Sequence, residues 1–384
     1  MSGGINHADY RAARRFAGLD GLRCLAITGV IWTHCPHPDF LPIFDKGRYG
    51  VDLFFVLSGF LIVTLLLREK AETGRIALGN FWARRALRLF PAYYFLLFAL
   101  LAKRLIFDPG DGETQALLDA FPSYALYLSN WTETQYFELG PMWSLATEEQ
   151  FYLIWPVIEA LLAPLRLAAW VVLVGLNQLM NFGLFDPWLS SALGTNDLSN
   201  VHITETTFTP ILLGVGLAHI LHRPAWYSRA SAVVGFRHAP LVYALAIIAL
   251  LFAPGASLSP PLRLMLHLAM ALWVASIVVT PSSRTARALE WRPVAFIGAI
   301  SYGMYLYHLF VIQRVAMLME RMGLPETPFV FLAGFALTVA VATVSFHLLE
   351  KPCLRLRDYF RGNRRYLRNQ IDPRRVIAEV EAGK

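Results

Sequence analysis

Charged side chains are scarce in this chain of 384 residues. Asp, Glu, Lys and Arg together make up 16% of it, whereas hydrophobic residues make up 56% and the mean hydropathy is +0.47. So few charges among so much apolar material exclude an ordinary soluble domain, in which about a quarter of the residues are charged. The apolar residues occur in blocks of 15–22 residues, and such blocks are long enough to cross about 30 Å of hydrocarbon.

Cysteine is equally rare, and the three cysteines give no disulfide framework. Cys24 and Cys35 fall on one expected helix, too far apart to bridge, and Cys353 lies in the expected cytoplasmic tail. No cleavable signal peptide is expected either, because the first apolar segment contains Arg23 and no small-residue cleavage site. No internal repeat is visible, and the inverted halves found in many transporters are not apparent.

The apolar blocks predict an all-α fold, a polytopic membrane helix bundle of about ten transmembrane helices. The expected spans lie near residues 18–37, 49–67, 89–106, 148–164, 167–185, 206–221, 240–254, 261–279, 294–313 and 328–349. The segment 121–130 is a candidate for an eleventh piece, short or re-entrant. A cytoplasmic segment, 1–17, precedes the membrane domain, 18–350, and a basic tail, 351–384, follows it, with no appended soluble domain expected.

Lysine and arginine are divided unequally between alternate loops. The loops on one side, together with both terminal segments, hold 26 of them, and the opposite loops hold 7. Because cytoplasmic loops carry the excess of positive charge, both termini are predicted to be cytoplasmic. The topology separates these basic residues among several loops, so nucleic-acid binding has little support. The tail alone has ten Lys and Arg and is expected to contact anionic lipid headgroups.

The first expected span contains two ionisable residues, Arg23 and His34. An arginine at bilayer depth costs about 2.5–3.5 kcal/mol on insertion scales, so such residues are usually functional. Eleven residues of helix bring both side chains onto one face, roughly 16 Å apart along the axis. The pair therefore predicts a functional site, although Arg23 snorkelling to the cytoplasmic surface and a satisfied His34 form an alternative.

The second span begins with the stretch Gly50–Ile62, which contains one carboxylate, Asp52. Gly50, Ser58 and Gly59 are typical of close helix packing. Asp52 is expected near the outer end of the span, where it would orient an imidazole or bind a polar substrate.

Three arginines, Arg84, Arg85 and Arg88, precede Pro91, a residue that suits the first turn of a helix. They are expected on the cytoplasmic side, and the residues alone favour a positive-inside anchor. Arg84 and Arg88 nevertheless share one helical face, and guanidinium groups suit phosphate recognition. A cytoplasmic donor that carries several phosphates would fit there.

Two acidic residues, Glu148 and Glu149, stand at the expected outer entry of the fourth span. Ser144 ahead of them is typical of a helix N-terminus, where carboxylates complement the dipole. Capping explains one carboxylate, whereas two of them beside Gln150 and several aromatic residues also resemble a carbohydrate-binding rim.

The ninth span contains the stretch Ser301–His308, which ends in a second intramembrane histidine. Ser301, Tyr305 and His308 fall on one helical face. The tyrosines suit ordinary packing, but His308 at this depth needs a partner.

Taken together, these motifs resemble the membrane-bound acyltransferase 3 family. The similar stretches, in the family's order, are Leu19–His34, Gly50–Ile62, Arg84–Tyr93, Trp143–Tyr152, Ser301–His308 and Glu350–Pro352. Six motifs in order cover essentially the whole chain, which makes the resemblance specific. Known members of the family transfer acyl groups, most often acetyl from acetyl-CoA, onto cell-surface sugars or small natural products.

The resemblance implies that His34 is the catalytic histidine and that Arg23 is also required. The residues implied to face the phosphates of acetyl-CoA from the cytoplasm are Arg84, Arg85 and Arg88, and Tyr93 of the same motif is implied to take part in binding the donor. This reverses the preference for an anchor. Some members carry an extracytoplasmic esterase-like domain, which this chain is expected to lack. It would then either modify the acceptor alone or hand the acyl group to a separate partner.

The sequence thus predicts a multi-pass O-acyltransferase of a bacterial plasma membrane, with a carbohydrate or lipid-linked sugar as acceptor. His34 would act as general base on an acceptor hydroxyl, or as the nucleophile that takes the acyl group. Four further residues would orient His34 or bind the acceptor: His308, Asp52, Glu148 and Glu149. Neither a metal site nor a permanently bound cofactor is expected.

Two other classes of protein compete with this interpretation. A transporter or flippase would use the intramembrane His, Asp and Arg residues as a relay, but it lacks support from an inverted repeat. A non-catalytic membrane scaffold would leave the intramembrane histidines without a role.

Overall fold

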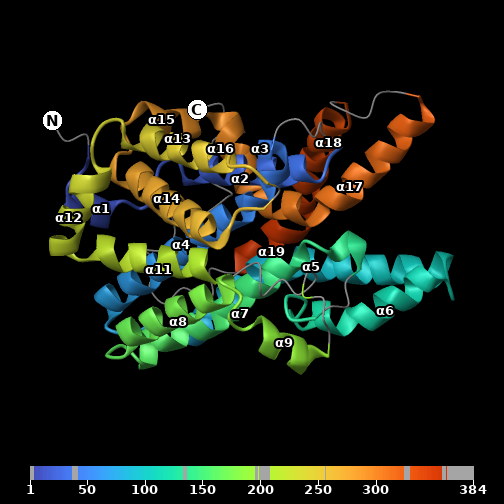
Figure 1. Ribbon diagram of the computed structural model, residues 1–384, viewed down its shortest axis with the longest axis horizontal. Helices are drawn as coiled ribbons and strands as arrows, with labels where there is room; N and C mark the ends of the chain where they lie inside the picture. Colours follow the sequence, from blue (N-terminus) through green and yellow to red (C-terminus); the bar gives the residue numbers. More distant parts are fainter. Residues whose placement is uncertain are drawn as a thin grey trace. The chain divides into compact units, whose positions relative to one another are not determined.

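The computed structural model describes residues 4–36, 42–132, 136–194, 198, 208–255, 257–323, 329–356 and 360. Regular structure in these residues is helical, without a β-strand, which confirms the expected all-α fold (Figure 1). The chain divides into two compact units. Unit 1 comprises residues 1–72, 210–346 and 363–384, and unit 2 comprises residues 73–209 and 347–362.

Unit 1 is built from the two ends of the sequence. Its helices are α1 (His7–Ala12), α2 (Leu19–Thr33), α3 (Pro42–Asp45), the 3₁₀ helix η1 (Lys46–Tyr49), α4 (Gly50–Thr73), α11 (Thr209–His222), α12 (Pro224–Val234), α13 (Ala239–Leu251), α14 (Pro260–Val279), α15 (Arg284–Leu289), α16 (Arg292–Ala299), α17 (Ser301–Arg321) and α18 (Phe329–Ser345). The most extensive helix pairings in it are α17 with α18, α2 with α16, and α13 with α14.

Unit 2 holds the middle of the sequence and a short return from the C-terminal part. Its helices are α5 (Leu78–Phe107), α6 (Gly112–Ala125), the 3₁₀ helix η2 (Phe137–Leu139), α7 (Met142–Leu161), α8 (Arg166–Asn181), α9 (Asp186–Leu193), the π-helix η3 (Phe346–Glu350) and α19 (Lys351–Leu356). Helix α5 is the longest and contacts α6, α7 and α19.

Each of the ten expected spans falls largely on a helix. The helices that are long and apolar enough to cross a membrane are Lys46–Thr73, Leu78–Phe107, Pro260–Val279 and Phe329–Leu356. Two further spans form only as bent pairs, α8 with α9 at 81° and α16 with α17 at 76°. By length and composition, the described residues therefore contain four to six spans. The number ten and the cytoplasmic placement of both termini stay predictions.

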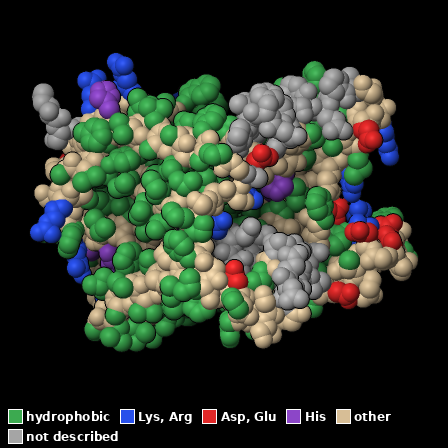
Figure 2. Space-filling view, viewed as in Figure 1, with side chains coloured by type: hydrophobic (Ala, Val, Ile, Leu, Met, Phe, Trp, Pro, Cys, Tyr) green, Lys and Arg blue, Asp and Glu red, His purple; other side chains and the backbone are tan. Residues whose placement is uncertain are grey.

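Large hydrophobic side chains are exposed on the outer surfaces of many helices. On α8, for example, Leu167 is 69% exposed and Val172 is 56% exposed. Hydrophobic side chains cover much of the face shown in Figure 2. Such a surface suits a surrounding of lipid tails, which do not penalise exposed apolar groups.

Helix α2 packs through glycines so closely that backbone meets backbone. A Cβ added to Gly298 of α16 would overlap the carbonyl oxygen of Asp20, and one added to Gly50 of α4 would overlap that of Ala26. Small residues permit such close approach of helices in a membrane. The helix with the first expected site motif is therefore fixed between α16 and the start of α4.

Two local predictions are wrong. Pro91 was expected in a first helical turn, but α5 begins at Leu78 and carries Pro91 in its interior. The segment 121–130 does not form a membrane piece of its own, because α6 includes Phe121, ends at Ala125 and is followed by a turn. Tyr127 in that turn has φ 54°, a left-handed conformation that stops a helix.

The substitution Gly298→Ala tests the close packing of α2. The added methyl group has no room beside the Asp20 carbonyl, so α16 must move away from α2. We expect a loss of about 1–3 kcal/mol of stability, typical of overpacking, measured as a lower unfolding temperature of the purified protein in detergent.

The matched control is Gly79→Ala in α5, where a Cβ would meet no atom within 4 Å. This variant should unfold at or slightly above the wild-type temperature, because alanine favours helix. Equal effects of the two substitutions would contradict the packing argument.

Candidate functional site

His34 and His308, here called the histidine pair, meet in unit 1. His34 follows directly after the last residue of α2 and is exposed, whereas His308 on α17 is 1% exposed. The centroids of the two imidazole rings lie 4.9 Å apart, with the ring planes at 64°. The structure thus gives His308 the partner that its depth demands, and the partner is the histidine that the first motif singled out.

Backbone carbonyl groups fix the tautomer of both rings. Nδ1 of His34 lies 2.8 Å from the carbonyl oxygen of Val30, and Nδ1 of His308 lies 2.7 Å from that of Tyr305. A carbonyl oxygen only accepts hydrogen bonds, so each Nδ1 carries the proton and each Nε2 carries a lone pair. Nε2 of His308 is buried and has no hydrogen-bond partner among the described residues.

Arg23 is held by a carboxylate of its own helix. Its guanidinium donates to Oδ1 of Asp20 at 2.7 Å, and Arg15 donates to Oδ2 of the same carboxylate at 3.0 Å. The side chain of Arg23 is 16% exposed. The sequence marked Arg23 but did not single out Asp20, whose place three residues earlier is the spacing of a helical ion pair.

Asp52 does orient an imidazole, but it is the imidazole of His267 on α14. Nε2 of His267 lies 3.0 Å from Oδ2 of Asp52, and both side chains are buried. Nδ1 of His267 is buried without a hydrogen-bond partner among the described residues. The sequence did not single out His267. The sequence nevertheless contained a feature that could have identified it, because a histidine within a long apolar block is costly without a partner.

The order of contacts along α2 separates this pair from the histidine pair. Gly47 packs against Gly29 and Thr33, whereas Gly50 packs against Ala26. The start of α4 therefore runs back along α2 toward its first turns. Asp52, two residues after Gly50, therefore lies beside the N-terminal half of α2 and not beside its C-terminal end, which His34 follows.

Three arginines on α5 form the arginine cluster of unit 2, namely Arg84, Arg85 and Arg88. Three other segments of the unit contact this cluster. Arg84 donates a hydrogen bond of 2.9 Å to the backbone carbonyl of Phe360. The Arg88 guanidinium interacts electrostatically with the buried carboxylate of Glu350, which ends the π-helix η3. The sequence noted the stretch around Glu350 as a motif but did not assign this residue to the site.

Arg85 lies between two aromatic rings and faces two carboxylates. Its guanidinium carbon is 5.9 Å from the ring centroid of Phe81 and 5.4 Å from that of Tyr152. Electrostatic interactions link it to Glu149 and Glu148. Trp82, one turn earlier, donates from its indole nitrogen to the carbonyl of Tyr152 at 3.0 Å; this contact also joins α5 to α7.

These contacts overturn the expected separation of the arginine cluster from Glu148 and Glu149 at opposite membrane surfaces. Helix α5 begins eleven residues before the expected span and α7 begins six residues before its own, so both motifs move toward the middle of their helices. Ser144 also does not cap α7. The helix starts at Met142, and the Ser144 hydroxyl donates to the carbonyl of Pro141.

Tyr93 on α5 is buried, and its hydroxyl already has a hydrogen-bond partner inside the protein. Its side chain is 0% exposed, and its hydroxyl donates to the carbonyl of Tyr124 at 2.8 Å. The Tyr93 ring stacks on that of Tyr127 at 4.3 Å between centroids. A hydrogen bond from Tyr93 to the donor would first have to break the bond to Tyr124.

A pair of side-chain amides, of which Asn130 is buried, joins the turn after α6 to α7. Asn130 donates to Oε1 of Gln150 at 3.1 Å, and Gln150 donates back to Oδ1 of Asn130 at 2.8 Å. Gln150 also donates to the carbonyl of Tyr127, and the Trp131 indole donates to Oε1 of Gln150. The reciprocal bonds fix the residue that follows Glu149. Sequence reasoning did not assign Asn130 to the site.

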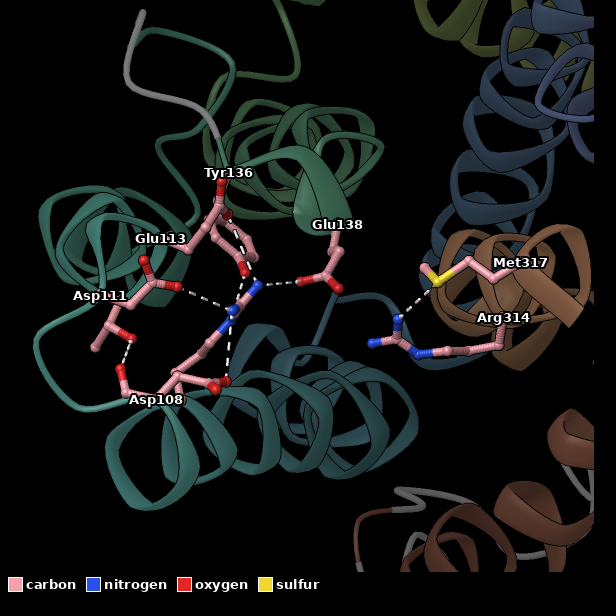
Figure 3. Close-up of polar contacts among 9 residues, drawn as sticks. Asp108, Asp111, Glu113, Tyr136, Glu138, Arg314 and Met317 are labelled. Carbon is pink, nitrogen blue, oxygen red and sulfur yellow. Dashed lines mark hydrogen bonds and ion pairs between the residues drawn. The ribbon is translucent and has the colours of Figure 1, made fainter. Parts of the chain in front are cut away.

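An acidic cluster surrounds Arg104 at the far end of α5 (Figure 3). The carboxylates within 4 Å of its guanidinium belong to Asp108, Asp111, Glu113 and Glu138. Arg104 also donates to the Tyr136 hydroxyl at 2.9 Å. Burial, reinforced by the Glu138 carboxylate, raises the pKa of Tyr136 to about 12. The cluster ties the end of α5 to the start of α6 and to η2, so its evident role is structural.

Metal coordination finds no support in the described part of the chain. There, no three His, Cys, Asp or Glu side chains are grouped so that they could hold a metal ion. Three buried imidazole and carboxylate groups have a protein partner instead: His308, His267 and Asp52.

The profile of one protein family, described as an acyltransferase domain, matches residues 16–347. The chain is 32% identical over 363 residues to the Bacillus subtilis protein named "Putative peptidoglycan O-acetyltransferase YrhL", a match that covers 88% of this chain and 55% of the relative. It is 33% identical over 355 residues to O-acetyltransferase OatA of Staphylococcus aureus, covering 88% and 57%. The chain thus spans little more than half the length of these curated relatives. No solved structure matches it.

The pairing of Asp52 with His267 is open to a direct test. Asp52→Asn replaces a charge-assisted bond by a weaker one and leaves the buried imidazole poorly paired, so we expect a loss of about 1–3 kcal/mol. In a double-mutant cycle with His267→Gln, measured by thermal unfolding, the two losses should be less than additive. The exposed Asp9→Asn serves as control, and additive losses would show that the pair is not coupled.

Proposed function

We propose that this chain, which belongs to the acyltransferase 3 family, is an integral membrane O-acetyltransferase of a bacterial plasma membrane. Acetyl-CoA is the donor, and a hydroxyl of a cell-envelope carbohydrate is the acceptor. The relatives named as O-acetyltransferases support the reaction, and the one named for peptidoglycan supports the class of acceptor. Among the structural observations, the histidine pair carries the proposal.

His34 is suited to be the general base. Its Nε2 holds a lone pair because Nδ1–H is bound to Val30, and its side chain is exposed to an incoming group. In the proposed reaction Nε2 takes the proton of the acceptor hydroxyl, whose oxygen attacks the thioester carbonyl carbon. The carbon–sulfur bond then breaks and the thiolate leaves. The imidazolium gives its proton to this thiolate, so coenzyme A is released as the thiol.

His308 supports His34 in this scheme. It is a neutral imidazole with an unbonded, buried Nε2 lone pair in ring contact with His34. A hydrogen-bond acceptor beside the imidazolium lowers the cost of placing a positive charge there. If His34 instead took the acetyl group as a nucleophile, Nε2 would again be the reacting atom.

The arginine cluster is proposed to bind the phosphates of acetyl-CoA. Arg84 donates to the backbone carbonyl of Phe360, and Arg85 and Arg88 interact electrostatically with carboxylates. A phosphate is a stronger partner for a guanidinium than a neutral carbonyl oxygen. In the proposal, Arg84 exchanges its bond to the Phe360 carbonyl for one to a phosphate of the donor.

The decisive substitution is His34→Gln. Glutamine retains a polar group of similar length at the end of α2 but does not accept a proton at neutral pH, so acetyl transfer from acetyl-CoA should fall at least a hundredfold. Transfer is measured as coenzyme A thiol released by purified protein with a soluble glycan fragment as acceptor. Thermal unfolding serves as the control for folding, and wild-type turnover in a folded variant would refute the role of His34.

The second substitution is Arg84→Gln. Loss of one guanidinium–phosphate contact should raise KM for acetyl-CoA about tenfold while kcat changes little, because the lost interaction is made equally in the ground and transition states. The matched control is Arg75→Gln, an exposed arginine that precedes α5. A variant with unchanged KM for acetyl-CoA would leave Arg84 as a membrane anchor only.

A further inference from the structure

Tyr127 of unit 2 presents an unused hydroxyl inside the protein. Its side chain is 8% exposed, and the hydroxyl oxygen has no hydrogen-bond partner among the described residues. The ring is fixed by stacking on Tyr93, with centroids 4.3 Å apart, and on Phe90 at 5.8 Å. A buried hydroxyl without a partner is unfavourable, so this position is suited to a group that the protein itself does not supply.

Glu149 presents an unused acceptor close to that hydroxyl. Its Oε1 is buried and has no hydrogen-bond partner in the described part of the chain. The next residue, Gln150, donates to the Tyr127 carbonyl at 2.8 Å, which holds α7 against the Tyr127 turn. The Glu149 carboxylate also interacts electrostatically with the Tyr127 hydroxyl. The two unused groups therefore belong to one place in unit 2.

Arg85 adds unused donors to the same place. Its guanidinium lies against the rings of Phe81 and Tyr152 and interacts electrostatically with Glu149. It makes no hydrogen bond to a described residue. Two donor groups and one acceptor thus remain open. A ligand that offers only acceptors, such as an ionised phosphate, would leave the Glu149 oxygen without a donor, so the ligand best suited to this place offers both an acceptor and a donor.

A secondary amide has this combination of groups. We propose that Glu149, Tyr127 and Arg85 bind the pantetheine arm of the donor, with the amide N–H donating to Glu149 and the amide carbonyl accepting from Tyr127 or Arg85. The inference rests on the proposed function, since pantetheine is the neutral part of acetyl-CoA. It assigns Glu149 to donor binding rather than to the orientation of His34, and it divides the arginine cluster by ligand: Arg84 binds phosphate and Arg85 binds the arm.

Fragments of the donor separate these roles. The full chain in detergent is titrated with coenzyme A and with adenosine 3′,5′-bisphosphate, which lacks the pantetheine arm. Glu149→Gln and Tyr127→Phe should each raise the Kd for coenzyme A about tenfold, the usual effect of losing one buried hydrogen bond. Both variants should bind the bisphosphate as the wild type does.

The matched control is Tyr94→Phe. Tyr94 neighbours the same rings, but its hydroxyl already donates to the carbonyl of Ala125 at 2.9 Å. This variant should bind coenzyme A like the wild type. Arg84→Gln should weaken both ligands, because both carry phosphates.

Each remaining outcome has a distinct meaning. If Glu149→Gln and Tyr127→Phe bind coenzyme A like the wild type, the pantetheine assignment is wrong although the proposed function stands. The assignment is also wrong if they weaken both ligands equally, or if they impair only transfer to the sugar acceptor. If folded wild-type protein does not bind coenzyme A at all, the proposed function itself fails.

Discussion

The backbone contact of α2 with its neighbours is the constraint on which unit 1 depends. Where Gly298 meets Asp20 and Gly50 meets Ala26, no side chain separates the helices. Lipid tails give apolar helices little reason to associate, so close packing must supply the attraction. Once α2 is fixed in this way, its Asp20–Arg23 ion pair lies at one end and His34 at the other, against His308 of α17.

Compensation of buried charge shapes both units in the same manner. Asp20 compensates Arg23, Asp52 pairs with His267, and Arg104 draws four carboxylates around itself. An isolated charge in an apolar surrounding is too costly to persist, so the fold brings a partner to each. Several buried polar atoms nevertheless have no partner among the described residues, and those of His308, Glu149 and Tyr127 are the ones that we assign to chemistry or to a ligand.

Unit 2 illustrates how far local sequence patterns can be trusted. The stretches around Arg85 and Glu149 were recognisable as sites, yet their placement at opposite membrane surfaces was wrong. Hydropathy locates the apolar middle of a span, whereas the helices continue into polar turns that it does not detect. Those extra turns carry Arg85 toward Glu149 and Tyr152. Asn130 was overlooked because an asparagine in a loop gives no signal of the amide pair that it forms with Gln150.

The sequence by itself determined the all-α membrane architecture, the family and the residues that interrupt the apolar pattern, because each of these is written in composition, spacing and motif order. It also marked Arg23, His34, Asp52 and His308 as candidate site residues and indicated that His308 needs a partner. Only the tertiary structure decided which partners they have: His308 for His34, and His267 rather than either of these histidines for Asp52. The physical reason is that pairing depends on the rotation and offset of packed helices, which side-chain volumes and glycine contacts set across the whole unit.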